Sequence, residues 1–288
     1  MKKYSIALAL LVYSATAWSC DVCGCTSMGF GLGNWAVNGQ STVGLRYSLR
    51  SFKGPEYTDH FHQTEVWGIY ALSSRFSLMG AVPYLQATRQ LAPGQTGSLN
   101  GLGDATLLAN YQFLQTRQGN WAHTASAAAG LNLPTGTFEN RENSLLAPNF
   151  QTGTGSFDFT VQGQYRLNYL ENFLVLQGQY LWNTTNRYDY KFGNQFMANL
   201  RLGRAFETEQ FKLLIFAGSG FENYARDVNS RNFYQYGTGG QVATTGLGFN
   251  FFWQHFWLGA EANTAVWQSL NSNYTPQTQV QVNLNYLF

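Results

Sequence analysis

Hydrophobic and polar residues alternate along most of the chain after Thr26, and turn residues interrupt this alternation at intervals. Segment 155–169 shows the pattern most clearly, with apolar residues at most odd positions from Phe157 to Tyr169 and polar residues at every even position. Successive side chains of a β-strand point to opposite faces of the sheet. The segment is therefore predicted to be a strand with one apolar and one hydrated face.

The same pattern recurs often enough to predict an all-β protein. Many of the predicted strands exceed ten residues, whereas strands of soluble proteins usually have 5–6 and membrane strands need roughly 9–11. Twelve segments qualify: 41–52, 61–72, 75–88, 101–115, 121–135, 155–169, 173–185, 190–206, 211–225, 240–253, 256–268 and 276–288. Tryptophans near their ends, Trp67 and Trp257 among them, predict aromatic girdles at two membrane interfaces.

The connections between these segments alternate between short and long. Short ones include Ser73-Ser74 and Gln254-His255, whereas 136–154 is the longest. Transmembrane barrels combine an even number of antiparallel strands with short periplasmic turns and longer outer loops. The sequence therefore predicts an up-and-down transmembrane antiparallel β-barrel of about twelve strands over residues 41–288, with both termini in the periplasm.

The last segment supports an outer-membrane barrel. Apolar residues occupy every second position from Val280 to the terminal Phe288, and polar residues lie between them. A strand of this kind that ends on an aromatic residue resembles the C-terminal signal read by the barrel assembly machinery. We therefore expect that machinery and outer-membrane lipid as partners.

Composition narrows the function classes. The 288 residues are 44% hydrophobic, 16% aromatic and only 11% charged, against about 25% charged in soluble domains. Beyond the first twenty residues no apolar run approaches the roughly 18 residues of a membrane helix. No cluster of Lys and Arg is present to bind a phosphate backbone, so nucleic acid is not an expected partner.

The N-terminus has the pattern of an export signal followed by a cysteine motif. Lys2-Lys3, a short apolar core and Ala15-Thr16-Ala17 predict a signal peptide over residues 1–19. The motif that follows contains Cys20, Cys23 and Cys25. Three interpretations are open: lipidation of Cys20, a soft-metal site for copper or zinc, or a disulfide in an oxidising compartment.

Residues 20–40 form a Cys- and Gly-rich segment before the first predicted strand. The stretch from Met28 to Asn34 contains three glycines. It is expected either to fold into the lumen as a plug at the periplasmic mouth or to remain a tail outside the barrel.

Charged residues on the polar faces of the strands are the candidate lumen residues. A charge on the lipid face costs about 2–4 kcal/mol at the membrane midplane, so these residues are expected to point inward. They are Arg46, Arg50, Glu65, Asp104, Asp158, Arg166, Arg201, Lys212, Glu222 and Glu261.

The function of these ten charges has two interpretations. They define a path for a solute, or they pair with one another and fill the lumen, because an unpaired buried charge is costly. Barrels of eight strands are filled by side chains and those of 16–18 strands hold a channel, so twelve strands predict a narrow or plugged pore. The four histidines do not suggest a nucleophile–base pair, and an enzyme is not expected.

Three internal motifs resemble a known family. Gly101-Leu102-Gly103-Asp104, Leu133-Pro134-Thr135-Gly136 and the segment 151–158 are similar to landmarks of the outer-membrane proteins grouped with the phenol-degradation MetA-pathway transporters. The N-terminal motif of Cys20, Cys23 and Cys25, followed by 43–47, resembles a bacterial subgroup of these transporters. The resemblance implies movement of small, often hydrophobic compounds across the outer membrane, and it names no binding residues.

These patterns together predict a passive transporter of small solutes in the bacterial outer membrane. The alternative is a non-conducting barrel whose cysteines bind a soft metal or anchor a periplasmic partner.

Overall fold

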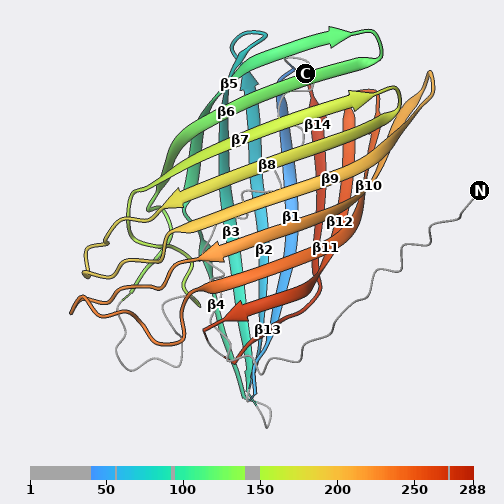
Figure 1. Cartoon of the computed structure of the whole chain (residues 1–288). Helices are drawn as coiled ribbons and strands as arrows, with labels where there is room; N and C mark the ends of the chain where they lie inside the picture. The colour runs from blue at the N-terminus through green and yellow to red at the C-terminus, as the bar shows by residue number, and fades with distance from the viewer. Residues whose placement is uncertain (1–39, 56, 92–94, 140–149, 272) are drawn as a thin grey trace, which may run out of the picture.

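A single antiparallel sheet closes on itself to form a barrel (Figure 1). The computed structural model describes residues 40–288 except 56, 92–94, 140–149 and 272. The predicted leader, the cysteines and the glycine-rich segment up to residue 39 lie outside the described residues. The strands in the described part are β1 (Thr42–Lys53), β2 (Tyr57–Ala71), β3 (Phe76–Leu91), β4 (Gln95–Leu102), β5 (Ala105–Gln118), β6 (Trp121–Leu133), β7 (Asp158–Tyr169), β8 (Asn172–Trp182), β9 (Gln195–Glu207), β10 (Phe211–Tyr224), β11 (Gly240–Trp253), β12 (Phe256–Leu270), β13 (Thr275–Pro276) and β14 (Gln279–Leu287).

The fourteen described strands fill twelve positions around the barrel. β4 and β5 both pair with β3, one after the other, and β13 and β14 do the same along β1. The barrel closes where β1 pairs with β14, from Thr42 opposite Leu287 to Leu49 opposite Val280. The predicted twelve-strand barrel is confirmed, and closure leaves no edge strand with unpaired backbone groups.

Several predicted strand boundaries were wrong. The predicted strand 101–115 is two strands separated at Gly103–Asp104, and its first part begins at Gln95. The predicted strand 190–206 begins at Gln195, because residues 183–194 form a loop held by side-chain hydrogen bonds. Alternation continues through such loops and therefore does not mark where pairing starts.

Short turns lie at one end of the barrel and longer loops at the other. The short-turn end contains residues 72–75, 119–120, 170–171, 208–210 and 254–255. The first and last strands also meet there, since the backbone N–H of Ser41 donates to the carbonyl of Phe288 at 3.0 Å. The long-loop end carries the segments between β6 and β7, β8 and β9, and β10 and β11.

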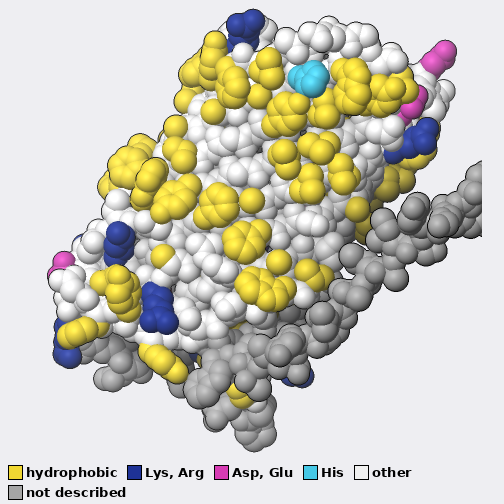
Figure 2. Space-filling model, in the orientation of Figure 1, with side chains coloured by type: hydrophobic (Ala, Val, Ile, Leu, Met, Phe, Trp, Pro, Cys, Tyr) yellow, Lys and Arg dark blue, Asp and Glu magenta, His cyan; other side chains and the backbone are white. Residues whose placement is uncertain are grey.

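The two faces of the wall differ sharply in chemistry. Hydrophobic side chains cover the outer wall, whereas the visible charged side chains gather towards its two ends (Figure 2). Val282, Leu284 and Tyr286 of β14 are exposed on this outer face, while Asn283 and Asn285 between them are buried. An apolar band with polar ends fits the hydrocarbon core of a membrane. No helix in the described part of the chain is long and apolar enough to cross a membrane.

The predicted aromatic girdle was wrong for two tryptophans. Trp121, Trp182, Trp253 and Trp267 are half exposed on the outer surface, but Trp67 and Trp257 are buried inside the barrel, each 2% exposed. Trp67 shares the inward face of β2 with Glu65, so its alternation position and not its nearness to a strand end decides its direction.

Glycines on the inner wall allow close approach between strands. A Cβ atom on Gly130 of β6 would lie 1.9 Å from the carbonyl oxygen of Leu107 in β5, whereas one on Gly163 of β7 would meet nothing within 4 Å.

We predict that Gly130→Val lowers the folded fraction after refolding into vesicles, because overpacking typically costs about 1–3 kcal/mol. Heat-modifiable gel migration measures that fraction. The matched Gly163→Val variant is expected to fold like the wild type, and equal loss in both variants would contradict the steric argument.

Candidate functional site in the barrel interior

The ten predicted lumen residues lie on the inward faces of their strands or at the break between β4 and β5. Arg46, Arg50, Glu65, Asp104 and Asp158 are buried; Arg166, Arg201, Glu222 and Glu261 are largely buried. Lys212 lies near the short-turn end, where its Nζ donates to Glu207 at 2.8 Å and its side chain is 39% exposed. The structure therefore brings most of these charges into one interior, but it leaves Lys212 at the rim.

Two ion pairs cross the lumen between strands that are not neighbours. Arg201 of β9 donates to Glu261 of β12 at 2.8 Å, and Arg50 of β1 donates to Glu222 of β10 at 2.6 Å. β9 and β12 are separated by β10 and β11, while β1 and β10 are separated by β14, β12 and β11. Each of these two contacts spans the lumen, and we call them the ion-pair bars. The Arg46–Glu65 pair at 2.5 Å joins the neighbouring strands β1 and β2 instead.

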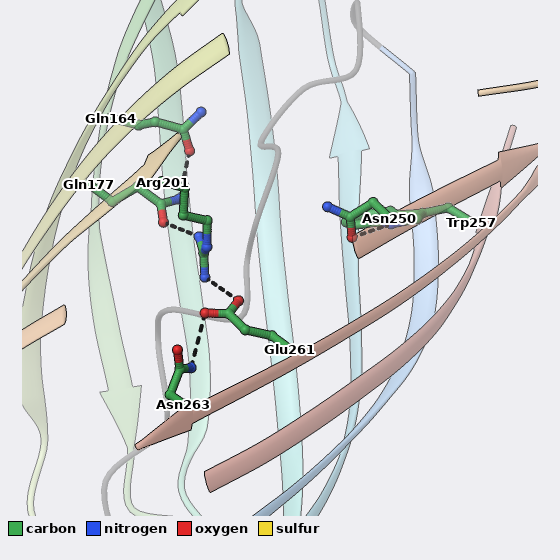
Figure 3. A network of polar contacts seen from close by, with 7 residues as sticks. All are labelled: Gln164, Gln177, Arg201, Asn250, Trp257, Glu261 and Asn263. Carbon is green, nitrogen blue, oxygen red and sulfur yellow. Dashed lines mark hydrogen bonds and ion pairs between the residues drawn. The ribbon is translucent and has the colours of Figure 1, made fainter. Parts of the chain in front are cut away.

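Amide side chains extend one of these bars around the wall. Gln177 donates to Gln164 at 2.8 Å and accepts from Arg201 at 2.9 Å, while Asn263 donates to Glu261 at 3.0 Å (Figure 3). The five residues come from β7, β8, β9 and β12 and form one continuous hydrogen-bonded chain. This network satisfies the buried carboxylate and guanidinium groups, which is the condition for such groups to be tolerated in an interior.

A small polar cavity lies between the two bars. It has a volume of about 60 Å³ and is lined by residues that include Arg50, Arg201, Glu222, Glu261 and Thr244. A water molecule needs about 10–15 Å³ on this measure, so the cavity has room for a few waters. In this conformation it is smaller than an organic solute requires.

An apolar layer lies on the short-turn side of the polar zone. Trp67 and Trp257 meet edge to face with ring centroids 6.2 Å apart, and Leu287 packs in the same cluster. Phe252 joins this layer to a second cluster that contains Phe173 and Phe216. The guanidinium of Arg46 lies 5.1 Å from the Trp67 ring centroid, so the polar zone begins directly behind the aromatic layer.

A second apolar layer lies on the long-loop side of the polar zone. It contains Phe52, Phe61, Tyr224 and Leu270 of four different strands, together with Phe150 of the loop between β6 and β7. Phe150 is 2% exposed and packs against Phe61 with ring centroids 5.5 Å apart. A loop residue thus reaches into the barrel and packs within this layer.

Two carboxylates hold the segment that follows Phe150 against the wall. Asp104 accepts hydrogen bonds from the backbone N–H groups of Gly136 and Thr154, at 2.9 and 2.7 Å. The Thr154 hydroxyl lies between Asp104 and Asp158, 2.7 and 3.1 Å from their oxygens. These two predicted lumen residues therefore anchor a loop. At the break between β4 and β5, the backbone N–H of Ala105 donates to the Thr135 hydroxyl at 2.8 Å.

One buried ion pair had not been predicted. Arg89 of β3 binds Asp59 of β2 through two hydrogen bonds of 2.8 and 2.7 Å, and its guanidinium lies 5.2 Å from the Phe150 ring centroid. Both residues lie just outside the predicted strands 61–72 and 75–88. Extending the alternation by two residues in each strand would have found the pair.

Arg166 contacts the aromatic layer near the short-turn end. Its Nε donates to Asn168 at 3.0 Å, and its guanidinium lies 5.5 Å from the Phe173 ring centroid. Within the described residues, no group of three or more His, Cys, Asp or Glu side chains could hold a metal ion. Cys20, Cys23 and Cys25, the predicted metal and lipidation residues, lie outside the described part of the chain.

Comparison with known proteins identifies the family. The family model described as "Putative MetA-pathway of phenol degradation" matches residues 34–283. The chain belongs to this family. No curated protein matches the chain. The family resemblance seen in the internal motifs is thereby confirmed, and membership of a subgroup with the N-terminal cysteine motif stays a prediction.

Solved structures with a similar fold are outer-membrane barrels. A crystallised outer membrane channel from Pseudomonas putida F1 has a TM-score of 0.66 at 14% identity, covering 88% of this chain and 97% of that one. The β-domain of the Bordetella autotransporter BrkA has a TM-score of 0.53 at 12% identity, with coverage of 86% and 100%. The translocator domain of the autotransporter NalP from Neisseria meningitidis has 0.51 at 12% identity, with coverage of 90% and 91%. At these identities the likeness shows the fold, which is that of a barrel of the bacterial outer membrane.

The cross-lumen pair Arg201–Glu261 predicts strong energetic coupling. Both side chains are less than one-fifth exposed, so Glu261→Gln is expected to lower the free energy of unfolding by about 3 kcal/mol, because it leaves a buried charge unpaired. Adding Arg201→Gln is expected to cost less than the sum of the single changes. Urea unfolding in vesicles, followed by tryptophan fluorescence, completes the double-mutant cycle.

The exposed pair Lys212–Glu207 provides the matched control. Exposed ion pairs contribute about 0–1 kcal/mol, so the same cycle at these positions is expected to show little coupling. Additive effects at Arg201 and Glu261 would contradict a bar that holds the walls together.

Proposed function

We propose that this barrel is a narrow, passive outer-membrane channel for small solutes and that the structure describes its closed state. The short turns and both termini face the periplasm, and the long loops face the outside, as in other outer-membrane barrels. The observation that carries the proposal is the pair of ion-pair bars beside a water-sized polar cavity. A barrel with a purely structural interior is more simply filled by apolar packing, which is often at least as stable as buried ion pairs.

The width of the barrel supports this proposal. Twelve positions lie between the filled eight-strand barrels and the open barrels of 16–18 strands. A lumen of this intermediate width is narrowed by its side chains, so that rearranging a few of them opens a path. The similar structure from Pseudomonas putida F1 is described as an outer membrane channel.

The layers of the interior favour solutes that combine an aromatic ring with a polar group. A solute crossing the barrel passes the Trp67–Trp257 layer, the polar zone and the layer around Phe150. Aromatic walls stack against rings, and the amides and charges of the middle zone bind hydroxyl or carbonyl groups. The family description mentions phenol degradation, which agrees with this solute class.

Single-channel recording in planar bilayers tests the proposal. We expect rare, small openings of the wild-type barrel and at least severalfold more frequent openings of the Arg201→Gln/Glu261→Gln variant, because one of the two charge pairs that cross the lumen is then removed. Phe150→Ala is expected to add to this effect. The Lys212→Gln/Glu207→Gln variant serves as the control and is expected to behave like the wild type. If every variant stays silent although heat-modifiable migration shows it folded, the channel proposal is wrong.

A second role rests on the predicted cysteine motif. Gln40, the first described residue, lines a small pocket with Ile69, Ser77 and Asn110 at the short-turn end. The chain thus reaches the barrel at the end that we assign to the periplasm, and this supports segment 20–40 as a plug of that mouth. There Cys20, Cys23 and Cys25 are suited to bind copper or zinc or to anchor a periplasmic partner, and Cys20 to carry a lipid. Equal zinc and copper(I) binding by the wild type and a triple Cys→Ser variant would exclude the metal.

The C-terminal strand suggests a partner during biogenesis. Phe288 is exposed at the short-turn end, and Tyr286 stacks beside it. We assign this pair as the contact for the barrel assembly machinery. Folding in cells, but not spontaneous folding into vesicles, is then expected to suffer when Phe288 is replaced by Ser.

A further inference from the structure

We propose that the loops between β8 and β9 and between β10 and β11 form a binding surface for the phosphate groups of an anionic glycolipid of the outer leaflet. The surface consists of residues 185–191 and 226–236 on the long-loop end of the barrel. The choice of an outer-leaflet glycolipid rests on the orientation given above. The contact with lipid phosphate itself does not depend on whether the barrel conducts.

The two loops are joined into a ladder beyond the barrel wall. Antiparallel bridges pair Thr185 with Lys191, Lys191 with Val228, and Val228 with Tyr234. Residues paired across antiparallel strands place their side chains on the same face. Thr185, Lys191, Val228 and Tyr234 therefore share one face of this ladder, which we call the ladder face.

The opposite side of the ladder packs against the loop between β6 and β7. Tyr190 and Phe192 pack on Phe138, and the Tyr190 hydroxyl donates to Asp227 at 2.6 Å. Asp227 also accepts from the backbone N–H of Gly193 at 2.7 Å. These contacts fix the ladder on its buried side, and the ladder face lies on the opposite side.

Cations and aromatic rings gather on the exposed parts of the ladder. Arg187, Arg226 and Arg231 are exposed, Lys191 is half buried, and none of the four takes part in an ion pair within the described residues. Phe233, Tyr234 and Tyr236 are 66%, 71% and 87% exposed. Figure 2 shows Lys or Arg and hydrophobic side chains side by side where Figure 1 places these loops.

The short-turn end differs in its charge pairing. Arg204 lies 3.8 Å from Glu171 and Lys212 lies 2.8 Å from Glu207, whereas Arg75 and Arg117 are exposed without an ion pair among the described residues. On the ladder, Asp189 is the exposed acid, and the other described acid, Asp227, is buried. The described residues of the ladder thus carry four cations against one exposed acid.

This combination fits a phosphorylated lipid headgroup. Tyrosine and other aromatic rings favour the membrane interface, and a Lys or Arg near an anionic lipid surface contributes about 1 kcal/mol, or about fivefold in affinity. The ladder stands immediately beyond an apolar wall that faces lipid, so headgroups lie beside it. A soluble anion would find the same charges but would gain nothing from the exposed rings.

Native mass spectrometry of the folded full-length barrel in neutral detergent tests the proposal, with bisphosphorylated lipid A as the probe. We expect lipid A to bind more tightly than phosphatidylcholine, and more weakly as salt is raised. The Arg187→Gln/Lys191→Gln/Arg231→Gln variant is expected to bind lipid A at least about tenfold more weakly. Tyr234→Ser with Tyr236→Ser is expected to weaken binding without changing its salt dependence.

Arg75, Arg117 and Arg204 at the short-turn end provide a matched triple control. Their replacement by Gln is expected to change lipid A affinity by less than about twofold. An equal loss in this control, or lipid A binding no tighter than that of phosphatidylcholine, would overturn the proposed surface. Tighter binding of phosphatidylglycerol than of lipid A would overturn the glycolipid assignment. Lipid A binding is measured without recording a current, so the two proposals can fail separately. A barrel that is silent in planar bilayers but binds lipid A would refute the channel and leave this surface intact.

Discussion

Backbone hydrogen bonding in a water-free medium is the constraint on which the rest of this structure depends. A free N–H or C=O group in hydrocarbon costs several kcal/mol, so a sheet that crosses a membrane has to close. Pairing of β1 with β14 closes this one. Closure divides every strand into an outward face, which is largely apolar, and an inward face, on which most charged side chains collect. The alternation along the chain is the direct consequence of that division.

The charged side chains on the inward faces are subject to a similar constraint. They are largely shielded from water, and each needs a partner, so Arg50 and Arg201 reach carboxylates on distant strands. The resulting bars lie between two apolar layers, one around Trp67 and Trp257 and one around Phe150. A lumen closed by a few paired charges differs from a lumen packed throughout. Its closure is held by interactions that water and solute groups can replace.

Much of the architecture could be predicted from alternation, including twelve positions, alternating loop lengths and inward charges. The partner of each charge could not, because Arg50 and Glu222 are 172 residues apart and their contact depends on barrel curvature. Trp67 was predicted at an interface although its position shares the inward face of Glu65. The closure by Phe150 lies in a loop without alternation, and the roles of Asp104 and Asp158 as loop anchors depend on backbone N–H groups that sequence patterns do not place. The Asp59–Arg89 pair was missed only because the predicted strands began at residue 61 and ended at residue 88, whereas β2 begins at Tyr57 and β3 ends at Leu91.

The central claim is that the Arg201–Glu261 bar excludes solutes from the polar cavity. Thr244 of β11 lines this cavity and is 8% exposed, so a cysteine there, in a chain whose three natural cysteines are changed to Ser, reports access directly. The measurement is its rate of reaction with a charged methanethiosulfonate reagent in intact vesicles, with Ser230→Cys in an exposed loop as the reference. The account predicts slow reaction at position 244 and at least about tenfold faster reaction once Arg201→Gln and Glu261→Gln are added. Fast reaction in both backgrounds would show that the bar does not close the lumen.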